Sequence, residues 1–349
     1  MTVFLTDADR QDLWSLFAGQ SILVTGGTGS FGRAFVRRIF EVAEPARVIV
    51  FSRDELKQFE MQQEAPFAND PRLRFFLGDV RDRNRLDVAL RDVDYVVHAA
   101  ALKQVPAAEY NPFESIRTNV FGAENVIQAA QANRVKRVIA LSTDKACTPI
   151  NLYGASKLAS DKLFVAANNM SGSCGTRFAV VRYGNVIGSR GSVIPFFQRL
   201  IAEGSDHLPI TDPRMSRFWL TLDQGVDFVL SSFLKMRGGE IFVPKIPSML
   251  MTDLATALAP NLPHRVVGVR PGEKLHEVMI VSDDARATVS LPDRYVIEPG
   301  FATFPRRTFV EDGYPKVAGD FAYSSDTNDW WLNGDGLHEL LGMPKRMIA

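Results

Sequence analysis

The sequence reads ILVTGGTGSFG at residues 22–32. The first four of these residues form a short apolar run that predicts a β-strand, and residues 34–40 predict a helix beyond the turn. Glycines in a Gly-x-x-Gly-x-x-Gly spacing lie between them. The first permits a tight turn, the second lets backbone N–H groups approach a pyrophosphate, and the third lets helix and strand pack closely. A glycine run alone could be an ordinary loop, but this context favours dinucleotide binding. We expect cofactor contacts from Gly26, Thr28, Gly29, Ser30, Phe31 and Gly32.

Further apolar runs alternate with helix-length segments through the first half of the chain. They occupy residues 48–51, 73–77, 95–101, 137–143 and 178–182. Strands this uniformly apolar are typical of a parallel sheet that helices cover on both faces. Right-handed crossovers then predict an α/β fold with a doubly wound, Rossmann-type parallel sheet, in which ligands bind beyond the carboxyl ends of the strands.

The composition argues against several classes of partner. Lys plus Arg and Asp plus Glu both number 40 in 349 residues, so no overall field would attract nucleic acid or an acidic membrane. No apolar run approaches the ~18 residues of a membrane span. Two cysteines, Cys147 and Cys174, are too few for a disulfide framework, which favours the reducing cytoplasm. The five histidines lack zinc-type spacing, so no metal is expected, and His98 is predicted to be a core residue.

The residues after the run at 48–51 decide which dinucleotide is expected. An NAD site usually places Asp or Glu there to accept from the ribose 2′-OH, whereas this chain reads SRDELK at 52–57. Basic and hydroxyl side chains suit a 2′-phosphate, which predicts NADP. The alternative is that Arg53 pairs with Asp54 or Glu55 at a helix start. Together with residues expected beside the adenine, ribose and nicotinamide, the predicted set is Ser52, Arg53, Asp54, Lys57, Asp79, Val80, Ala99, Ala100, Ala101, Lys103, Tyr153 and Lys157.

The regular alternation of predicted strands and helices ends after residue 185. Prolines then separate short elements, among them predicted helices at 222–236 and 252–259. We expect a smaller C-terminal substrate-binding lobe over the carboxyl edge of the sheet. The predicted division is an N-terminal amphipathic extension (1–19), an NADP-binding Rossmann domain (20–185), a mainly substrate-binding lobe (186–301) and an irregular C-terminal tail (302–349).

Two motifs carry the chemistry, STDK at 142–145 and YGASK at 153–157. Tyr153 and Lys157 lie four residues apart on one face of a predicted helix. There the ammonium is expected to lower the phenol's pKa from about 10 toward neutrality and make the phenolate a usable base. Asp144 and Lys145 add an acid and an amine that simple hydride transfer does not need. That surplus predicts elimination in addition to oxidation.

These motifs make the chain resemble the inverting UDP-N-acetylglucosamine 4,6-dehydratases of the pseudaminic acid pathway, in the extended short-chain dehydrogenase/reductase superfamily. The glycine turn and the Tyr/Lys pair specify only the superfamily. The Asp-Lys sequence after Thr143 narrows the resemblance to the inverting dehydratases within it. Glucose dehydratases carry Asp-Glu there, and membrane-anchored relatives that retain C5 configuration have Met at the tyrosine position. The matching stretches are SRDELK (52–57), AAALK (99–103), STDKA (142–146), NLYGASK (151–157), RYGNV (182–186), GSRGS (188–192) and RPGEK (270–274).

The resemblance implies conversion of UDP-N-acetylglucosamine to UDP-2-acetamido-2,6-dideoxy-β-L-arabino-hexos-4-ulose, with tightly bound NADP recycled in each cycle. It also implies a homo-oligomer, hexamer or dimer. We hypothesise that Tyr153, helped by Lys157, takes the 4-OH proton while Thr143 holds O4. Lys145 then takes the C5 proton, and Asp144 protonates the departing 6-OH. Reprotonation at C5 from the opposite face inverts that centre.

A diphosphate substrate requires cations from the second lobe. The expected substrate contacts are Lys103, Thr143, Asn185, Arg190, Arg217 and Arg270. Arg190 and Arg217 could instead be solvated surface charges. Phe196 and Phe197 could flank uracil or belong to the core.

Two alternatives stay open at the level of sequence. An adjacent Asp⁻/Lys⁺ pair stabilises both charged forms, whereas burial favours the free amine and the carboxylic acid. If the ion pair persists, Lys145 serves as both base and acid, and Asp144 only tunes it. The alternatives to the dehydratase are a nucleotide-sugar 4-epimerase of the same superfamily and a non-catalytic NADP-sensing regulator.

Overall fold

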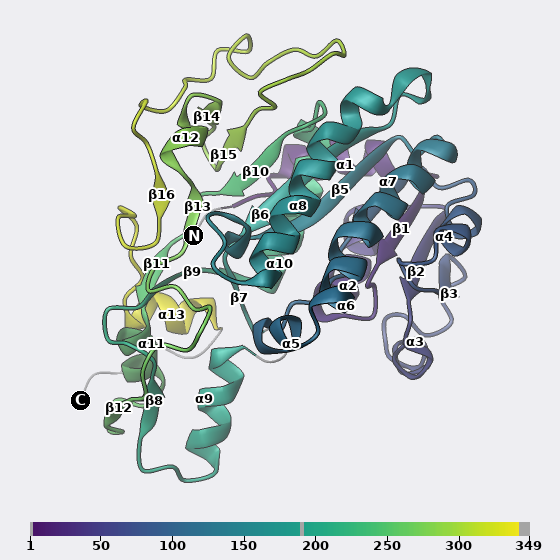
Figure 1. Cartoon of the computed structure of the whole chain (residues 1–349). Coiled ribbons are helices and arrows are strands. Elements are labelled where there is room, and N and C mark those ends of the chain that lie inside the picture. The colour runs from purple at the N-terminus through teal and green to yellow at the C-terminus, as the bar shows by residue number, and fades with distance from the viewer. Residues whose placement is uncertain (1–2, 189–191, 342–349) are drawn as a thin grey trace.

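A large, mainly parallel sheet lies at the centre of the molecule (Figure 1). The computed structural model describes residues 3–188 and 192–341. Within them, the strands of this sheet follow the order β14-β15-β10-β6-β5-β4-β1-β2-β3, and the remaining strands form small separate sheets. The strands are β1 (Ser21–Thr25), β2 (Arg47–Ser52), β3 (Leu73–Leu77), β4 (Tyr95–His98), β5 (Arg137–Thr143), β6 (Arg177–Tyr183), β7 (Asn185–Ile187), β8 (Leu208–Ile210), β9 (Ser216–Thr221), β10 (Ile241–Pro244), β11 (Ser248–Leu250), β12 (His264–Val266), β13 (Val278–Ile280), β14 (Thr288–Ser290), β15 (Arg294–Ile297) and β16 (Tyr323–Ser324).

The strand order confirms the predicted α/β, doubly wound Rossmann-type fold. β1 pairs in parallel with both β2 and β4, so successive strands are added on opposite sides of β1. This is the switch point at which open α/β sheets bind ligands. β5 and β6 continue the parallel sheet beyond β4, and Thr143 at the end of β5 lies opposite Tyr183. The sheet therefore brings the glycine turn and the STDK motif to one carboxyl edge.

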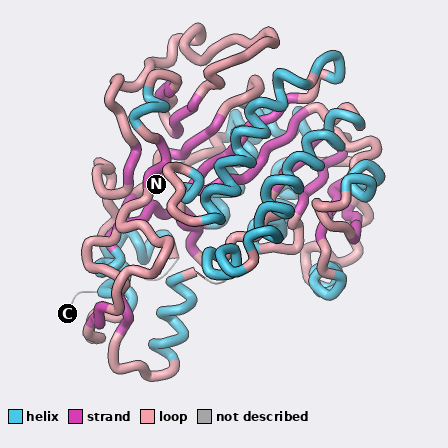
Figure 2. The backbone as a smooth tube through the Cα atoms, in the orientation of Figure 1, coloured by secondary structure: helices cyan, strands magenta, loops and turns pink. Residues whose placement is uncertain are grey.

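Helices cover both faces of the sheet (Figure 2). α2 packs with α10 and α1, whereas α7 packs with α4 and α8. The α-helices are α1 (Asp7–Phe17), α2 (Ser30–Val42), α3 (Glu55–Gln63), α4 (Arg83–Ala89), α5 (Val105–Tyr110), α6 (Pro112–Ile116), α7 (Gly122–Ala132), α8 (Leu152–Ala167), α9 (Val193–Ala202), α10 (Leu222–Lys235), α11 (Met251–Leu258), α12 (Ser282–Ala285) and α13 (Gly334–Leu340). The other helical segments are η1 (Arg117–Phe121), η2 (Asp144–Ala146), η3 (Asn168–Met170) and η4 (Gly172–Cys174).

The N-terminal extension forms α1, which docks on its own chain. Leu13 and Phe17 are fully buried. The ring of Phe17 meets Tyr95 and Phe233 edge-on, with centroids 4.9 and 5.5 Å apart. Asp9 completes a capping box at the helix start and lies 3.6 Å from Lys235 Nζ on α10. This helix is thus part of the main core.

Residues beyond 185 contribute to the main sheet as well as to a second lobe. β10 joins β6 in parallel, and β15 and β14 extend that edge with antiparallel pairing. The end of the sheet therefore does not coincide with the predicted boundary at residue 185. These strands are only three or four residues long, too short for a periodic pattern to be recognised.

The second lobe has a core of its own, in which Ile194, Phe197, Trp219, Leu254 and Leu337 are buried together. The C-terminal tail, predicted to be irregular, supplies two regular elements. β16 pairs with β13, and α13 packs on α11. In Figure 1, α9, α11 and α13 lie beside the sheet rather than over its helical layers.

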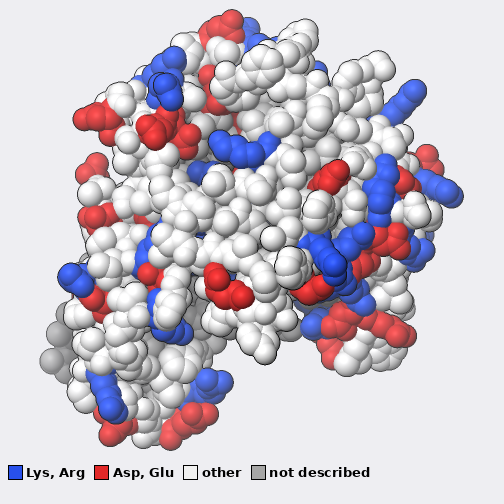
Figure 3. Space-filling model, viewed as in Figure 1, with Lys and Arg blue, Asp and Glu red and all other residues white. Residues whose placement is uncertain are grey.

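Charges of both signs are interspersed on the face that Figure 3 shows. Lys and Arg lie beside Asp and Glu, as the equal totals of 40 allow. Among the described helices, none combines the length and the apolar character that crossing a bilayer requires.

Candidate active site

The glycine turn between β1 and α2 forms a cradle in which side chains have no room. Gly26 has a φ of +66°, a left-handed conformation that favours glycine. A Cβ on Gly26 would lie 3.0 Å from the backbone nitrogen of Ala100, and one on Gly32 would lie 2.4 Å from Cα of Gly27. Among the described residues no side chain caps α2 at Gly29, so the first-turn N–H groups are available to an anion. These residues fit the pyrophosphate of a dinucleotide.

The loop after β4 is drawn against this turn by Thr25. Its Oγ1 accepts from the backbone nitrogens of Ala99 and Ala100 at 3.1 and 3.2 Å, and contacts His98 Nδ1 at 2.8 Å. Burial, and then the charge of Lys157, lower the pKa of His98 to about 3. His98 is therefore a neutral core residue, as the sequence predicts. The backbone of residues 99–101 passes over the glycine turn, where a ribose would approach.

Cations gather at the carboxyl end of β2. Arg53 is half exposed, and its Nη1 lies 3.5 Å from Asp79 Oδ2 rather than against Asp54 or Glu55. Asp54 instead caps α3 by accepting from the backbone nitrogen of Lys57 at 3.0 Å, and its Oδ2 lies 2.7 Å from Lys57 Nζ. Ser52 is buried, and its Oγ accepts from Gln58 Nε2 at 3.0 Å.

Arg33 is a cation of this region that the sequence reasoning missed. Its Nη2 donates to the backbone oxygen of Lys57 at 3.3 Å, its Nε donates to that of Thr28, and Glu64 forms an ion pair with it. The sequence feature that could have identified Arg33 is its position directly after the last glycine of the turn. Val80, at the predicted adenine edge, is buried, and its backbone oxygen accepts from Asn125.

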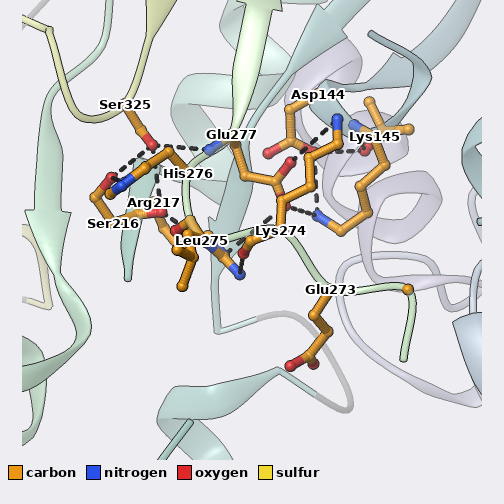
Figure 4. A network of polar contacts seen from close by, with 12 residues as sticks. Asp144, Lys145, Ser216, Arg217, Glu273, Lys274, Leu275, His276, Glu277 and Ser325 are labelled. Carbon is orange, nitrogen blue, oxygen red and sulfur yellow. Dashed lines mark hydrogen bonds and ion pairs between the residues drawn. The ribbon is translucent and has the colours of Figure 1, made fainter. Parts of the chain in front are cut away.

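The STDK motif places a buried carboxylate and an amine directly beyond β5. Thr143 Oγ1 donates to Asp144 Oδ1 at 2.8 Å. Lys145 Nζ lies 3.1 Å from Asp144 Oδ1 and 3.2 Å from Glu277 Oε1, as Figure 4 shows. Asp144 is fully buried, whereas 29% of the Lys145 side chain is exposed. The amine therefore sits between two carboxylates and still reaches the surface of the site.

In the protein without substrate, burial and the two neighbouring carboxylates have opposite effects on whether Lys145 is an ammonium or a free amine. Burial lowers the pKa of Lys145, but the carboxylates of Asp144 and Glu277 raise it by more, so the ammonium is favoured. The Asp144–Lys145 ion pair is therefore favoured before a sugar nucleotide binds, and which group acts as the acid depends on the charges in the substrate complex. Lys103 lies close enough to be affected: burial, and then repulsion from Lys145, lower its pKa.

Tyr153 and Lys157 lie on the first turns of α8, which Asn151 caps by accepting from the backbone nitrogen of Gly154 at 2.7 Å. Burial raises the pKa of Tyr153 to about 12, against the charge of Lys145 and a hydrogen bond with Thr143. The expectation of a phenol pKa near neutrality is thus wrong for the protein alone, because burial outweighs the charge of Lys145. Burial also lowers the pKa of Lys157, against the attraction of Asp161.

Glu277 is the main residue of this site that the sequence reasoning missed. Its side chain is 2% exposed, and the residue lies directly before β13. Arg217 Nε is 3.8 Å from Glu277 Oε1, and Lys274 Nζ is 4.0 Å from Oε2. The available signal was an acidic residue three positions after Lys274, directly before the apolar run VMI.

The predicted substrate-binding residues differ in their burial and in the groups that they contact. Arg217 is buried and donates to the backbone oxygens of Ser216, Leu275 and Lys274, so it fixes the loop before β13. Arg270 is 72% exposed and pairs with Glu273 at 2.9 Å. Asn185 begins β7. Arg190 lies outside the described residues.

The two aromatic residues considered for uracil differ in burial. Phe197 belongs to the core of the second lobe, whereas Phe196 is 38% exposed and has Arg199 over its ring.

Residues 22–299 match the family described as polysaccharide biosynthesis protein. Two curated relatives are similar to nearly the whole chain. The UDP-N-acetylglucosamine 4,6-dehydratase (inverting) of Campylobacter jejuni subsp. jejuni serotype O:23/36 (strain 81-176) is 57% identical over 332 residues, covering 93% of this chain and 98% of that protein. A UDP-glucose 4-epimerase of Rickettsia bellii (strain OSU 85-389) is 42% identical over 333 residues, with 93% and 96% covered.

Solved structures resemble this fold to different extents. The X-ray structure of Pen from Bacillus thuringiensis has a TM-score of 0.83 and 36% identity, covering 93% of this chain and 98% of that one. The crystal structure of DesIV, a dTDP-glucose 4,6-dehydratase from Streptomyces venezuelae with NAD and TYD bound, has a TM-score of 0.65 and 28% identity, covering 73% and 87%.

Proposed function

The chain belongs to the polysaccharide biosynthesis protein family, and from this premise we propose that it is a UDP-N-acetylglucosamine 4,6-dehydratase that inverts C5. The observation that carries the proposal is the Asp144–Lys145 pair, held at 3.1 Å beside the helix of Tyr153. A simple epimerase has no use for this acid and amine. The relative from Campylobacter jejuni, at 57% identity, supports the same reaction.

The cofactor that we propose is NADP. A bound nicotinamide dinucleotide would supply the group that accepts hydride from C4 and returns it to C6. The glycine turn would hold its pyrophosphate, and Arg33, Arg53 and Lys57 would surround a 2′-phosphate at the end of β2. A guanidinium is suited to phosphate oxygens because its N–H groups form a planar fork.

Oxidation at C4 uses groups on β5 and α8. Thr143 lies near enough to Tyr153 to lower its pKa, and both would meet the 4-OH of the sugar. Tyr153 accepts the hydroxyl proton as the C4–H bond breaks, with the buried Lys157 one helical turn away. Because burial raises the pKa of Tyr153 to about 12, the phenolate depends on positive charge near it in the complex.

Water loss uses Lys145 and Asp144. The new ketone at C4 acidifies C5–H, and Lys145 takes that proton. The 3.1 Å contact lets the proton pass to Asp144 Oδ1 and from there to the departing 6-OH. Asp144 can take part because its Oδ2 is buried and, within residues 3–188 and 192–341, has no hydrogen-bond partner. After C6 is reduced, C5 takes a proton that comes from solvent on the opposite face of the ring, which inverts that centre, and Tyr153 returns the 4-OH proton to solvent.

The sugar nucleotide would lie against the loop before β13. Arg270 is the exposed cation there, and we assign it to the diphosphate, with Lys103 and Asn185 closer to the sugar. We further propose that the enzyme is a cytoplasmic homo-oligomer and that its product enters pseudaminic acid-type sugar biosynthesis. The motif resemblance supports these last two proposals.

The direct test replaces Lys145. With NADP and UDP-N-acetylglucosamine, the wild type is expected to form a 4-keto-6-deoxy product that mass spectrometry and NMR identify. Lys145→Ala is expected to lower the rate of water loss by about 100-fold or more, because a positioned base contributes at least that much, while NADP binding stays nearly intact. Lys136→Ala, which removes a 54% exposed lysine beside the start of the same strand, is the matched control. Wild-type turnover by Lys145→Ala would show that the base is misassigned.

A second candidate, a nucleotide-sugar 4-epimerase, is favoured by the 42% identity to the protein from Rickettsia bellii that carries an epimerase name. The same incubation separates the two. An epimerase returns a galacto-isomer of unchanged mass, whereas a dehydratase releases water.

A further inference from the structure

Glu277 is a buried carboxylate that takes no part in the steps proposed for oxidation and water loss. It belongs to the segment directly before β13, and its carboxyl group lies beside Lys145 and Asp144 (Figure 4). Its Oε1 lies 3.2 Å from Lys145 Nζ, and its Oε2 has no hydrogen-bond partner among the residues that the structure describes. Ser325 Oγ accepts from the backbone nitrogen of Glu277 at 2.9 Å, which fixes its position on the strand.

The proposed chemistry demands a proton acceptor beside Lys145. Two carboxylates hold Lys145 as an ammonium, and an ammonium cannot take a proton from C5. The ammonium proton must therefore leave before C5–H is broken. A bound sugar would separate Lys145 from bulk water, so the acceptor has to be a group already in contact with Nζ.

Of the two carboxylates in contact, Glu277 is the better acceptor for this proton. Asp144 Oδ1 already receives the hydroxyl of Thr143 at 2.8 Å, and Asp144 is needed at the departing 6-OH. The Oε2 of Glu277 has no donor to give up. Burial, and then repulsion from Asp144, raise the pKa of Glu277, against the charges of Lys145, Arg217 and Lys274.

We propose that Glu277 takes the ammonium proton of Lys145 when the sugar nucleotide binds, and so converts Lys145 into the free amine that acts on C5. In this step one N–H bond of Nζ breaks and one O–H bond forms on Oε1, across the 3.2 Å contact. The freed lone pair then accepts the C5 proton. That proton leaves through Asp144 with the departing hydroxyl, so Lys145 returns to the amine and Glu277 keeps its proton for the rest of the cycle. The inference rests on the proposed dehydratase function.

The surrounding charges are compatible with this transfer. The groups that face Glu277 are Asp144 and Lys145 from η2, Arg217 from β9 and Lys274 from the preceding loop. Transfer removes one positive and one negative charge, so the net charge of the group is unchanged. Asp144 is then the remaining carboxylate, while Arg217 and Lys274 stay charged. Burial under substrate favours a neutral pair over an ion pair that has lost its hydration.

The test uses Glu277→Gln, which keeps the shape of the side chain but cannot take the proton. With bound NADP and UDP-N-acetylglucosamine, this variant is expected to reduce the nicotinamide in a single turnover but to lose water at least about 10-fold more slowly than wild type near pH 7. Reduced nicotinamide should therefore accumulate and be visible by its absorbance. The proton of Lys145 must then leave to solvent, so kcat should rise about tenfold per pH unit above neutrality. The wild-type kcat should change much less over the same range.

Glu240→Gln is the matched control, because Glu240 is another fully buried glutamate, paired with Arg306 at 2.8 Å directly before the amino end of β10. It is expected to keep the wild-type pH profile even if its melting temperature falls. The melting temperature and NADP affinity of Glu277→Gln establish that it is folded. If it fails this check, Glu277→Asp takes its place, and a shortened carboxylate should give slow turnover with the wild-type pH profile.

Two outcomes would contradict the account, and they lead to different conclusions. Water loss by Glu277→Gln at the wild-type rate and with the wild-type pH profile would overturn the role of Glu277 and leave the proposed function intact. Absence of water loss in the wild type would instead overturn the proposed function itself.

Discussion

At the scale of single residues, the charge of Lys145 depends on neighbours from distant parts of the chain. The sequence places Asp144 beside it, and the resemblance of motifs predicts Tyr153 and Lys157 nearby. The sequence places Glu277 directly before the apolar run VMI, but the pattern does not show that folding brings it within 3.2 Å of Lys145 Nζ, far away along the chain. The burial that raises the pKa of Tyr153 is likewise a property of the folded site.

The choice of dinucleotide is also decided by single residues. Arg53→Ala is expected to weaken NADP⁺ binding by about 10- to 100-fold, because a charge-assisted hydrogen bond contributes about 1.5–3 kcal/mol. NAD⁺ affinity should change little, since Asp79 loses only its weaker partner at 3.5 Å and keeps Arg81 at 2.6 Å. Calorimetric titration with NADP⁺ and with NAD⁺ measures the two dissociation constants and their ratio.

Arg47→Ala is the control for this substitution, because Arg47 begins the same strand at the opposite end and donates to the backbone oxygens of Arg91 and Asp92. It should leave both affinities unchanged. An equal loss of NADP⁺ and NAD⁺ affinity in Arg53→Ala would argue against recognition of a 2′-phosphate.

At the scale of elements, the long apolar strands were predictable and their ends were not. The run at 137–143 is β5 with the same bounds, whereas the run at 95–101 ends as a strand at His98. The reason is Thr25, whose hydroxyl accepts from the next two backbone nitrogens and turns the chain over the glycine cradle. A side-chain contact between two strands is not visible in the pattern of either one.

The contact between α8 and η2 gives a prediction at this scale. A Cβ on Gly154 would lie 2.1 Å from the backbone oxygen of Lys145, so Gly154→Ala must push the two elements apart. We expect a loss of about 1–3 kcal/mol in the free energy of unfolding, as for other overpacked sites. Activity should fall further than stability explains, because Tyr153 and Lys145 move relative to each other.

Chemical denaturation measures the loss of stability in Gly154→Ala, and steady-state kinetics measures the loss of activity. Ala155→Ser, at the next position but exposed, should leave both near wild type. Unchanged kinetics in Gly154→Ala would mean that the spacing of α8 and η2 does not set the geometry of the site.

At the scale of the whole molecule, the α/β fold and the edge that carries the site followed from the sequence, but the limits of the sheet did not. β10, β15 and β14 come from the stretch assigned to the second lobe. That lobe is tied to the sheet through the site itself: Asn151 Nδ2 donates to the backbone oxygen of Gly272, and Lys274 Nζ donates to that of Cys147. The loop at 270–274 is thus positioned by the same residues that position α8 and η2.

The most direct test of the central claim is the product that the wild-type enzyme forms from UDP-N-acetylglucosamine in deuterated water. An amine that removes the C5 proton, followed by reprotonation from the opposite face, predicts a 4-keto-6-deoxy sugar nucleotide with deuterium at C5 and inverted configuration there. Mass spectrometry reports the lost water, and NMR reports the label and the stereochemistry. A product that keeps all its oxygen, or one with protium at C5, would contradict the account.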